Sequence, residues 1–180
     1  MTVGRPPVAG RYRLNEALGV GGMGRVWMAR DDILDRDVAI KEIVLPADLI
    51  AAERDAVQRR TLREARAAAR LSHPHVAQVY DVFEADGRTW IVMEYVSSRS
   101  LQEVVRADGP LEPPRVAQIG LELLAALDAA HRAGVRHRDV KPANVLLARD
   151  GRVVLTDFGI ASIEGDSIVT SSELVLGRRR

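Results

Sequence analysis

Residues 135–147 read Val-Arg-His-Arg-Asp-Val-Lys-Pro-Ala-Asn-Val-Leu-Leu, and the rest of the chain can be interpreted outward from this stretch. Within six residues it places an acid, Asp139, a base, Lys141, and an amide, Asn144, between apolar neighbours. Such groups are costly to bury unless charged or metal partners satisfy them. A further acid, Asp157, begins the run Asp-Phe-Gly ten residues after Leu147. A functional site is one interpretation, and a solvated turn with unrelated charges is the other.

Upstream, the segment 19–24 reads Gly-Val-Gly-Gly-Met-Gly, with four glycines in six residues. Glycine lacks the Cβ atom that would keep a backbone away from phosphate oxygens, so such a segment can cover phosphates. Dinucleotide-binding folds use a similar loop, but there a helix follows it. Here strand-like segments lie on both sides, 12–18 and 25–30, and a further strand is predicted over 37–43. The sequence therefore favours a glycine loop between two strands, with a flexible hairpin as the alternative.

Two charged residues lie on otherwise less polar faces of predicted elements. Lys41 shares a face of the strand 37–43 with Ala39, which fits a nucleotide pocket, and an exposed edge lysine is the alternative. The segment 51–70 is rich in Ala, Glu and Arg and predicts a helix. Helical spacing puts Glu64 on the less polar face of this helix, away from a stripe of arginines. Pairing of Glu64 with a neighbouring arginine is left open.

The second half of the sequence predicts strands first and helices later. Strands are expected over 76–83 and 89–96. A capping-box pattern at Ser100 predicts a short helix. A longer helix over 113–132 is expected to be a buried scaffold, because it carries a broad apolar stripe of Val116, Ile119, Leu123, Leu124, Leu127 and Ala130. A hairpin over 145–156 then delivers Asp157.

The composition excludes several classes of protein. The 180 residues carry a net charge of +1, so no global field points to nucleic acid or to acidic lipid. Cysteine is absent, which fits a reducing cytoplasm. No window approaches the roughly 18 apolar residues that a membrane span needs. We therefore expect a cytoplasmic protein with no nucleic-acid partner and no membrane segment, which begins with a flexible leader over 1–10.

Together, the motifs resemble a known family. The pattern His137-Arg138-Asp139-x-Lys141-x-x-Asn144 followed by Asp157-Phe158-Gly159, with the glycine loop and Val38-Ala39-Ile40-Lys41, is similar to that of bacterial eukaryotic-like (Hanks-type) serine/threonine protein kinases. The resemblance extends from Tyr12 to about Gly177. It implies an α+β, bilobal fold. The N-lobe over 11–96 is expected to be complete, with an antiparallel sheet, one helix and the hinge, and the helical C-lobe over 97–180 to be incomplete and to end in the activation segment.

The resemblance also implies ATP and Mg²⁺ as cofactors. It assigns the nucleotide contacts to the glycine loop, to flanking residues and to the hinge, namely Leu18, Gly19, Val20, Gly21, Gly22, Met23, Gly24, Val26, Ala39, Lys41, Met93, Glu94, Val96 and Leu146. In this set the backbone of Glu94 and Val96 contacts adenine, and Met93 is the gatekeeper. Magnesium, a hard ion that prefers oxygen ligands, is assigned to Asn144 and Asp157.

For phosphoryl transfer the resemblance implies catalytic roles for four residues. Lys41 holds the α- and β-phosphates and is itself held by Glu64. Asp139 orients the substrate hydroxyl and accepts its proton, and Lys141 contacts the γ-phosphate. The implied partners are proteins that present serine or threonine. Self-association for autophosphorylation would modify one of the hydroxyls that would face Arg138, which are Thr170, Ser171 and Ser172, and an unmodified polar loop is the alternative.

One departure from the family pattern lies at the end of the chain. After Gly177 the pattern requires a hydroxyl residue and a Tyr-x-x-Pro-Glu stretch, whereas three arginines follow here. The sequence therefore predicts a kinase truncated in its activation segment, with the apolar stripe of the helix 113–132 left uncovered. The expected function is ATP-dependent phosphorylation of serine and threonine in proteins. The alternative is an inactive fragment that only binds nucleotide or a partner protein, and a small-molecule phosphotransferase is more remote.

Overall fold

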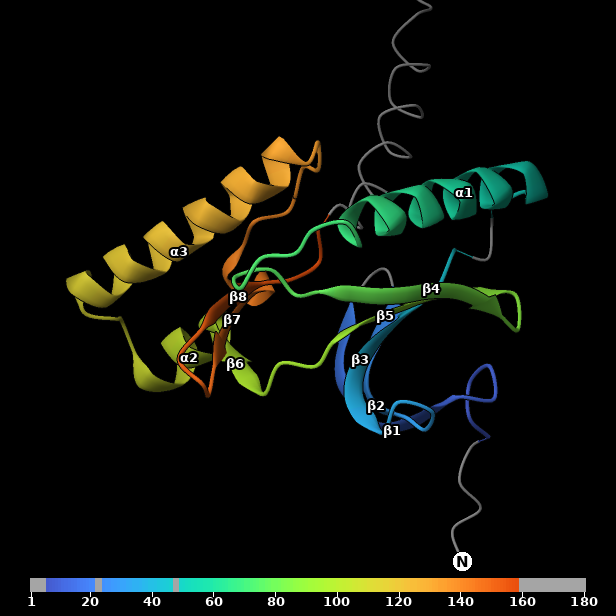
Figure 1. Ribbon diagram of the computed structural model, residues 1–180, viewed down its shortest axis with the longest axis horizontal. Helices are drawn as coiled ribbons and strands as arrows, with labels where there is room; N and C mark the ends of the chain where they lie inside the picture. The colour runs from blue at the N-terminus through green and yellow to red at the C-terminus, as the bar shows by residue number, and fades with distance from the viewer. Residues whose placement is uncertain (1–5, 22–23, 47–48, 159–180) are drawn as a thin grey trace, which may run out of the picture.

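The computed structural model describes residues 6–21, 24–46 and 49–158, which form two halves (Figure 1). The first half is a five-stranded antiparallel sheet in the order β1-β2-β3-β5-β4, with the helix α1 along it. The second half contains α2, α3 and a three-stranded antiparallel sheet in the order β6-β7-β8. The elements are β1 (Tyr12–Gly21), β2 (Gly24–Asp31), β3 (Arg36–Ile43), α1 (Ala51–Ala68), β4 (Val79–Ala85), β5 (Arg88–Glu94), β6 (Ser98–Ser100), α2 (Leu101–Asp108), α3 (Pro113–Arg132), the 3₁₀ helix η1 (Pro142–Asn144), β7 (Val145–Ala148) and β8 (Val153–Leu155).

Both faces of the large sheet carry buried side chains. Successive side chains of β3 point to opposite faces, so alternate residues enter two different clusters. Val38 and Ile40 belong to one buried cluster, which includes Tyr12. Ala39 belongs to another cluster, which includes Ala65 of α1. Complete burial of a side chain such as Ile40 stabilises the fold by about 1.5–3 kcal/mol. The helix α1 is therefore fixed against the sheet face that also carries Ala39.

The helices of the second half begin and end where local signals predict. The hydroxyl of Ser100 accepts a hydrogen bond from the Glu103 amide at 3.2 Å, and the Glu103 carboxylate accepts one from the Ser100 amide at 2.7 Å. This reciprocal cap satisfies two amides that the first turn of α2 leaves open. Two prolines, 113 and 114, occupy the first turn of α3, and Gly134 follows its end with a φ of 74°.

Only part of the predicted apolar stripe on α3 is buried. Ile119 is buried in a core cluster with residues of β7 and β8, and Leu123 and Leu127 pack against that cluster. Val116 and Leu124 are instead exposed, at 53% and 63%. The expectation of a buried scaffold helix is therefore wrong in part. The expectation of an uncovered stripe is also wrong in part, because the small sheet covers one side of α3.

Some boundaries differ from those predicted. β4 begins at Val79 rather than at residue 76, because Val76 forms a parallel bridge with Leu155 of β8. The strand β6 was not predicted, since three polar residues give no strand signal until β7 pairs with them. In the expected leader, the Val8 amide donates to the Tyr12 carbonyl at 2.8 Å, so this part of the leader contacts the sheet.

The predicted α+β class and order of elements are confirmed, with a sheet and one helix first and a helical half second. None of the helices in the described part of the chain has the length and apolar character needed to cross a membrane. Between the halves the chain passes from β5 to β6, close to the β7–β8 hairpin (Figure 1). The candidate site lies at this junction.

Candidate active site

A cleft of about 370 Å³ opens at the junction of the two halves. This volume lies in the range of about 300–1,000 Å³ that is usual for small-molecule sites. Of the residues assigned to the nucleotide or the metal from sequence, those that line the cleft are Leu18, Gly19, Val26, Ala39, Met93, Glu94, Val96, Leu146 and Asp157. The fold therefore brings together residues from β1, β2, β3, β5, the hinge, β7 and the segment after β8.

The cleft has further walls that the sequence did not indicate. They consist of Tyr95, Ser98, Ser100, Glu103, Ala143 and Thr156. The pairing of Ser100 with Leu146 between β6 and β7 places the start of α2 beside the cleft. The sequence marked Ser100 and Glu103 only as a helix cap, and no local pattern shows that a cap also faces a pocket.

Two glycines of the glycine loop, Gly24 and Gly19, differ in what a side chain would meet at their positions. Gly24 of β2 pairs with Gly21 of β1 and has a φ of 132°. A Cβ atom on Gly24 would lie 1.8 Å from the backbone oxygen of Glu42 in β3, so this glycine is required by the fold. A Cβ atom on Gly19 would meet nothing within 4 Å, so the space beside Gly19 is open to a ligand. Gly22 and Met23 lie outside the described residues.

Lys41 and Glu64, which were expected to pair, have other partners. The Nζ atom of Lys41 lies 2.9 Å from Oδ1 of Asp157. Oε1 of Glu64 accepts hydrogen bonds from Arg138 at 3.0 Å and from Arg60 at 3.3 Å. The expectation that Glu64 holds Lys41 is therefore wrong for this structure, and the alternative of an arginine partner is observed. Both Lys41–Asp157 and Glu64–Arg138 join the first half to a loop of the second.

Two arginines lie close to Glu64. A guanidinium presents several donors in a rigid fork that matches a carboxylate, and two of them flank Glu64, from Arg60 one helical turn before it and from Arg138. The other carboxylate oxygen, Oε2, is buried and accepts no hydrogen bond from the described residues. An orphaned buried oxygen is costly. Glu64 therefore still has one oxygen that can accept a further hydrogen bond.

Asp139 lies in a small network of charged and polar groups. Its Oδ2 atom is 2.6 Å from the Lys141 ammonium and accepts a hydrogen bond from the side-chain nitrogen Nδ2 of Asn144 at 3.1 Å. That nitrogen also donates to the Asp139 backbone oxygen at 2.8 Å. Burial raises the pKa of Asp139, but the hydrogen bonds from Lys141 and Asn144 outweigh it, so the pKa lies below its ordinary value. Asp139 is therefore a carboxylate at neutral pH and can accept a hydrogen bond from a hydroxyl.

His137 connects the loop of Asp139 to the segment of Asp157. Its Nδ1 atom accepts a hydrogen bond from the Asp139 amide at 3.2 Å, and its Nε2 atom lies 2.8 Å from the Thr156 carbonyl oxygen. These partners require a neutral ring with its proton on Nε2. Burial lowers the pKa of His137 and so favours the neutral form. The sequence analysis used His137 only as part of a motif, whereas the structure shows that it links two candidate site residues.

Two residues of these loops adopt backbone conformations that are rare outside glycine. Arg138 has a φ of 68° and Asp157 has a φ of 64°. Such conformations cost about 1–3 kcal/mol each and persist only when their surroundings fix them. Here each residue is held by an ion pair to the first half, Arg138 by Glu64 and Asp157 by Lys41.

Asn144 and Asp157 fit a magnesium ion only together with a phosphorylated ligand. The Thr156 amide donates to the Asn144 backbone oxygen at 3.0 Å, so Asp157 follows directly after a residue bonded to Asn144. Among the described residues no group of three or more acidic, histidine or cysteine side chains is arranged to hold a metal. Magnesium in phosphoryl-transfer sites uses one or two carboxylates and completes its shell with phosphate oxygens and water. The donor set of one carboxylate and one amide oxygen is of this kind.

Comparisons with known proteins agree with this geometry. Residues 12–174 match the protein kinase domain family. The chain is 41% identical to the serine/threonine-protein kinase PrkC of Bacillus subtilis over 170 residues, which cover 94% of this chain and 26% of that protein. It is 43% identical to the serine/threonine-protein kinase PknB of Mycobacterium leprae over 177 residues, which cover 96% of this chain and 28% of that protein. The chain thus spans about a quarter of the length of these curated relatives.

Solved structures show the same fold. The PknI kinase domain of Mycobacterium tuberculosis is similar with a TM-score of 0.76 and 37% identity, over 90% of this chain and 62% of that chain. The apo form of PpkA-294 is similar with a TM-score of 0.80, but at 24% identity it supports the fold alone. The chain therefore belongs to the protein kinase family, and the expected resemblance to bacterial serine/threonine kinases and the bilobal fold are confirmed.

Proposed function

We propose that this chain binds magnesium–ATP between its two halves and transfers the γ-phosphoryl group to serine or threonine hydroxyls of proteins. The observation that carries the proposal is that Asp157, which lines the cleft, pairs with Lys41, while His137 joins the loop of Asp139 to the segment of Asp157. Lys41 comes from β3, Asp139 from the loop after α3, and Asp157 from the segment after β8. A nucleotide with metal-bound phosphates requires this combination of an apolar slot and adjacent charges.

In this proposal the adenine ring lies between the apolar side chains of Val26, Ala39 and Leu146, with the backbone of Glu94 and Val96 at its edge. The open space beside Gly19 and the ammonium of Lys41 receive the phosphates. Asn144 and Asp157 hold magnesium through oxygen atoms. Bound magnesium would neutralise charge on the phosphate oxygens. All five residues of the adenine region line the same cleft, which supports the placement.

Phosphoryl transfer needs positioning and charge neutralisation more than covalent help. The Asp139 carboxylate orients the substrate hydroxyl and accepts its proton as the hydroxyl oxygen bonds to the γ-phosphorus and the bond to the β–γ bridging oxygen breaks. Its low pKa makes it a weak base, which suits an orienting role with late proton transfer. Lys141, 2.6 Å from Asp139, is within reach of the transferred group.

A nucleotide-binding role without transfer is the second candidate function, and one observation favours it. Glu64 contacts Arg138 and Arg60 rather than Lys41. The family arrangement for transfer would require Glu64 to bind Lys41, for which its orphaned oxygen, Oε2, is available. The proposed sites of autophosphorylation at residues 170–172 lie outside the described residues.

The test is incubation of the purified chain with magnesium, γ-labelled ATP and a generic basic protein. We expect label on the basic protein, or on the chain itself at residues 170–172, and we expect Asp139→Asn and Lys41→Met each to remove it. Asp128→Asn is the matched control, because Asp128 is an exposed residue of α3 that forms an ion pair with Arg132 of the same helix, 2.9 Å away. Label that survives both active-site substitutions would contradict transfer, and ATP binding without any label would favour the second function.

A further inference from the structure

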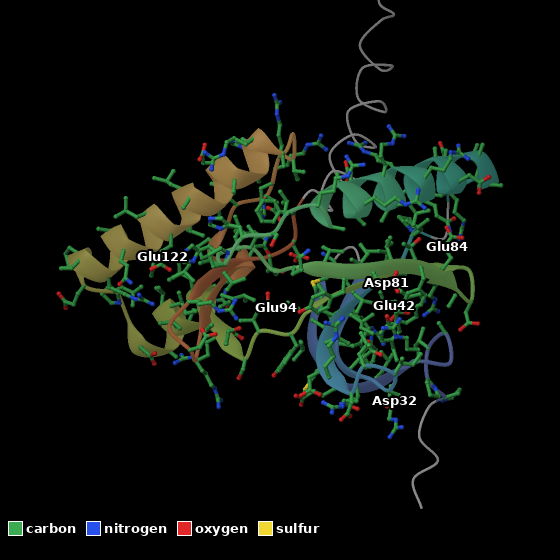
Figure 2. All side chains as sticks on the ribbon, in the orientation of Figure 1. Asp32, Glu42, Asp81, Glu84, Glu94 and Glu122 are labelled. Atoms are coloured by element: carbon green, nitrogen blue, oxygen red, sulfur yellow. The ribbon has the colours of Figure 1, made fainter. Side chains whose placement is uncertain are left out.

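The carboxylate of Glu94 has contacts that adenine recognition does not explain. Glu94 ends β5 and lines the cleft, where its backbone oxygen is the proposed acceptor for adenine. Its side chain, however, is only 19% exposed and is held from two sides. Oε1 accepts a hydrogen bond from Arg152 at 2.9 Å, and Oε2 accepts one from the Gln78 amide at 3.4 Å. Figure 2 shows Glu94 at the junction of the two halves.

Arg152 belongs to the other half of the molecule. It follows the turn between β7 and β8, where Gly151 has a φ of 93°. The Asp150 carboxylate fixes its orientation by accepting from the Arg152 side chain at 2.8 Å and from its amide at 3.1 Å. A third contact reaches the Pro74 carbonyl at 3.5 Å. Asp150, in the same turn, therefore holds the guanidinium in the orientation in which it contacts Glu94.

Backbone hydrogen bonds place the same hairpin against the hinge. The Arg149 amide donates to the Ser97 carbonyl at 2.9 Å, and the Glu94 amide donates to the Gln78 carbonyl at 2.8 Å. These bonds fix the two ends of the segment 94–97. Between them Val96 packs in a buried cluster with Val154 of β8, and the Glu94 side chain adds a charged contact with the same hairpin through Arg152. A mostly buried carboxylate that loses its cationic partner is strongly disfavoured where it stands. Without Arg152, Glu94 would therefore move toward water and shift the end of β5.

We propose that Arg152 is a positioning residue of the nucleotide site, which acts through the Glu94 carboxylate to place the hinge carbonyl that receives the amino group of adenine. The inference deepens the proposed function and rests on it. Arg152 does not line the cleft and so does not touch the nucleotide. Its loss should affect recognition of the base rather than of the phosphates. ATP should therefore lose more affinity than inosine triphosphate, which carries an oxygen in place of the amino group.

The test compares the dissociation constants of magnesium–ATP and magnesium–inosine triphosphate by titration calorimetry. In Arg152→Met we expect the constant for ATP to rise about fivefold, as for the loss of the neutral hydrogen bond between the adenine amino group and the hinge carbonyl, and that for inosine triphosphate to rise less than about twofold. Arg152→Lys should give an intermediate ratio, because a lysine keeps the charge but cannot hold Asp150 and Glu94 together. Arg132→Met, which breaks the exposed Arg132–Asp128 pair of 2.9 Å on α3, is the matched control and should change neither constant.

Two further measurements separate positioning from stability. Because Arg152 acts through Glu94, Arg152→Met should add little to the effect of Glu94→Gln on the ATP constant. Thermal unfolding without nucleotide is measured for each variant, and a lower Tm with an unchanged preference for ATP would overturn the inference and leave the proposed function intact. If Arg152→Met does not fold, an unchanged preference in Arg152→Lys would overturn it equally. Failure of the unsubstituted chain to bind ATP would overturn both.

Discussion

The sheet half and the helical half differ in where they leave apolar side chains exposed. In the sheet half the most exposed ones lie at the edges of the sheet: Val20, at 75%, near the end of β1, and Ile33, at 70%, between β2 and β3, where the buried Asp31 carboxylate accepts from the Ile33 and Leu34 amides at 3.2 Å. In the helical half they lie on a regular helix, α3, where Leu121 is 70% and Leu124 is 63% exposed. The sheet half thus completes its core with its own elements, whereas the described helical half covers only one side of α3.

The largest effect is expected at Gly24, which the sheet half needs for the close approach of β2 to β3. Gly24→Ala forces a Cβ atom to within 1.8 Å of the Glu42 carbonyl, so we expect a loss of more than about 3 kcal/mol or no folding. Gly19→Ala is the matched control, with nothing within 4 Å of the added atom, and should cost less than about 1 kcal/mol. Urea unfolding measures both, and equal losses would contradict this view of the sheet.

Truncation to alanine should change the free energy of unfolding by different amounts on the two sides of α3, although by less than the substitution at Gly24. Ile119 is buried at 4% exposure, so Ile119→Ala should lower the free energy of unfolding by about 2–4 kcal/mol. Leu124→Ala, on the exposed side, should change it by less than about 0.5 kcal/mol. Chemical denaturation of both variants checks the difference. A loss at Leu124 as large as that at Ile119 would show that the exposed side is covered in solution.

A smaller effect is expected from pH through His137. Burial lowers the pKa of His137 below its ordinary 6.5, so the unfolded chain binds a proton more readily than the folded one. Stability is therefore present above about pH 6.5 and is lost as the pH falls below it, toward the folded pKa. Burial lowers the pKa of His73 in the same direction. Between about pH 7.5 and 5.5 the free energy of unfolding should fall by less in His137→Gln than in the unsubstituted chain. Glutamine is chosen because it keeps a donor for the Thr156 carbonyl. An unchanged fall would show that His137 does not contribute to the pH dependence.

The smallest change in stability is expected when exposed apolar residues of α3 are made polar. The double variant Leu121→Gln/Leu124→Gln should alter the free energy of unfolding by less than about 1 kcal/mol, because neither side chain is buried. Its self-association should nevertheless fall, because exposed apolar surface on one helix favours contacts between molecules. Light scattering against concentration measures this. Association as strong as in the unsubstituted chain would show that another surface mediates the contacts between molecules.

Local patterns predicted the elements better than their partners. The glycine loop between strands, the strand with Lys41 and the cap of α2 follow from neighbouring residues, and the structure contains each of them. The strand β6 and the late start of β4 at Val79 could not be predicted, because both depend on pairing with β7 or β8 from a distant part of the chain.

The candidate site shows the same limit. Residues on one strand or loop, such as Asp139 and Asn144, were predicted together and lie together. The partner of Glu64 depends on where α1 lies relative to the loop of Arg138, which no local pattern fixes. Arg152 had no signal at all, since an arginine after an Asp-Gly turn is ordinary until the fold brings Glu94 to it. The catalytic, nucleotide and metal assignments stay predictions.

The central claim is that the cleft and the two charged loops form one magnesium–ATP site. Titration calorimetry with ATP tests it most directly, once in the presence of magnesium and once with a chelator in its place. The account predicts saturable binding that weakens about tenfold or more when magnesium is removed, because phosphate charge is then left unneutralised. In Asp157→Asn this dependence on magnesium should disappear. Absence of binding at millimolar ATP, or an equal dependence on magnesium in both proteins, would contradict the account.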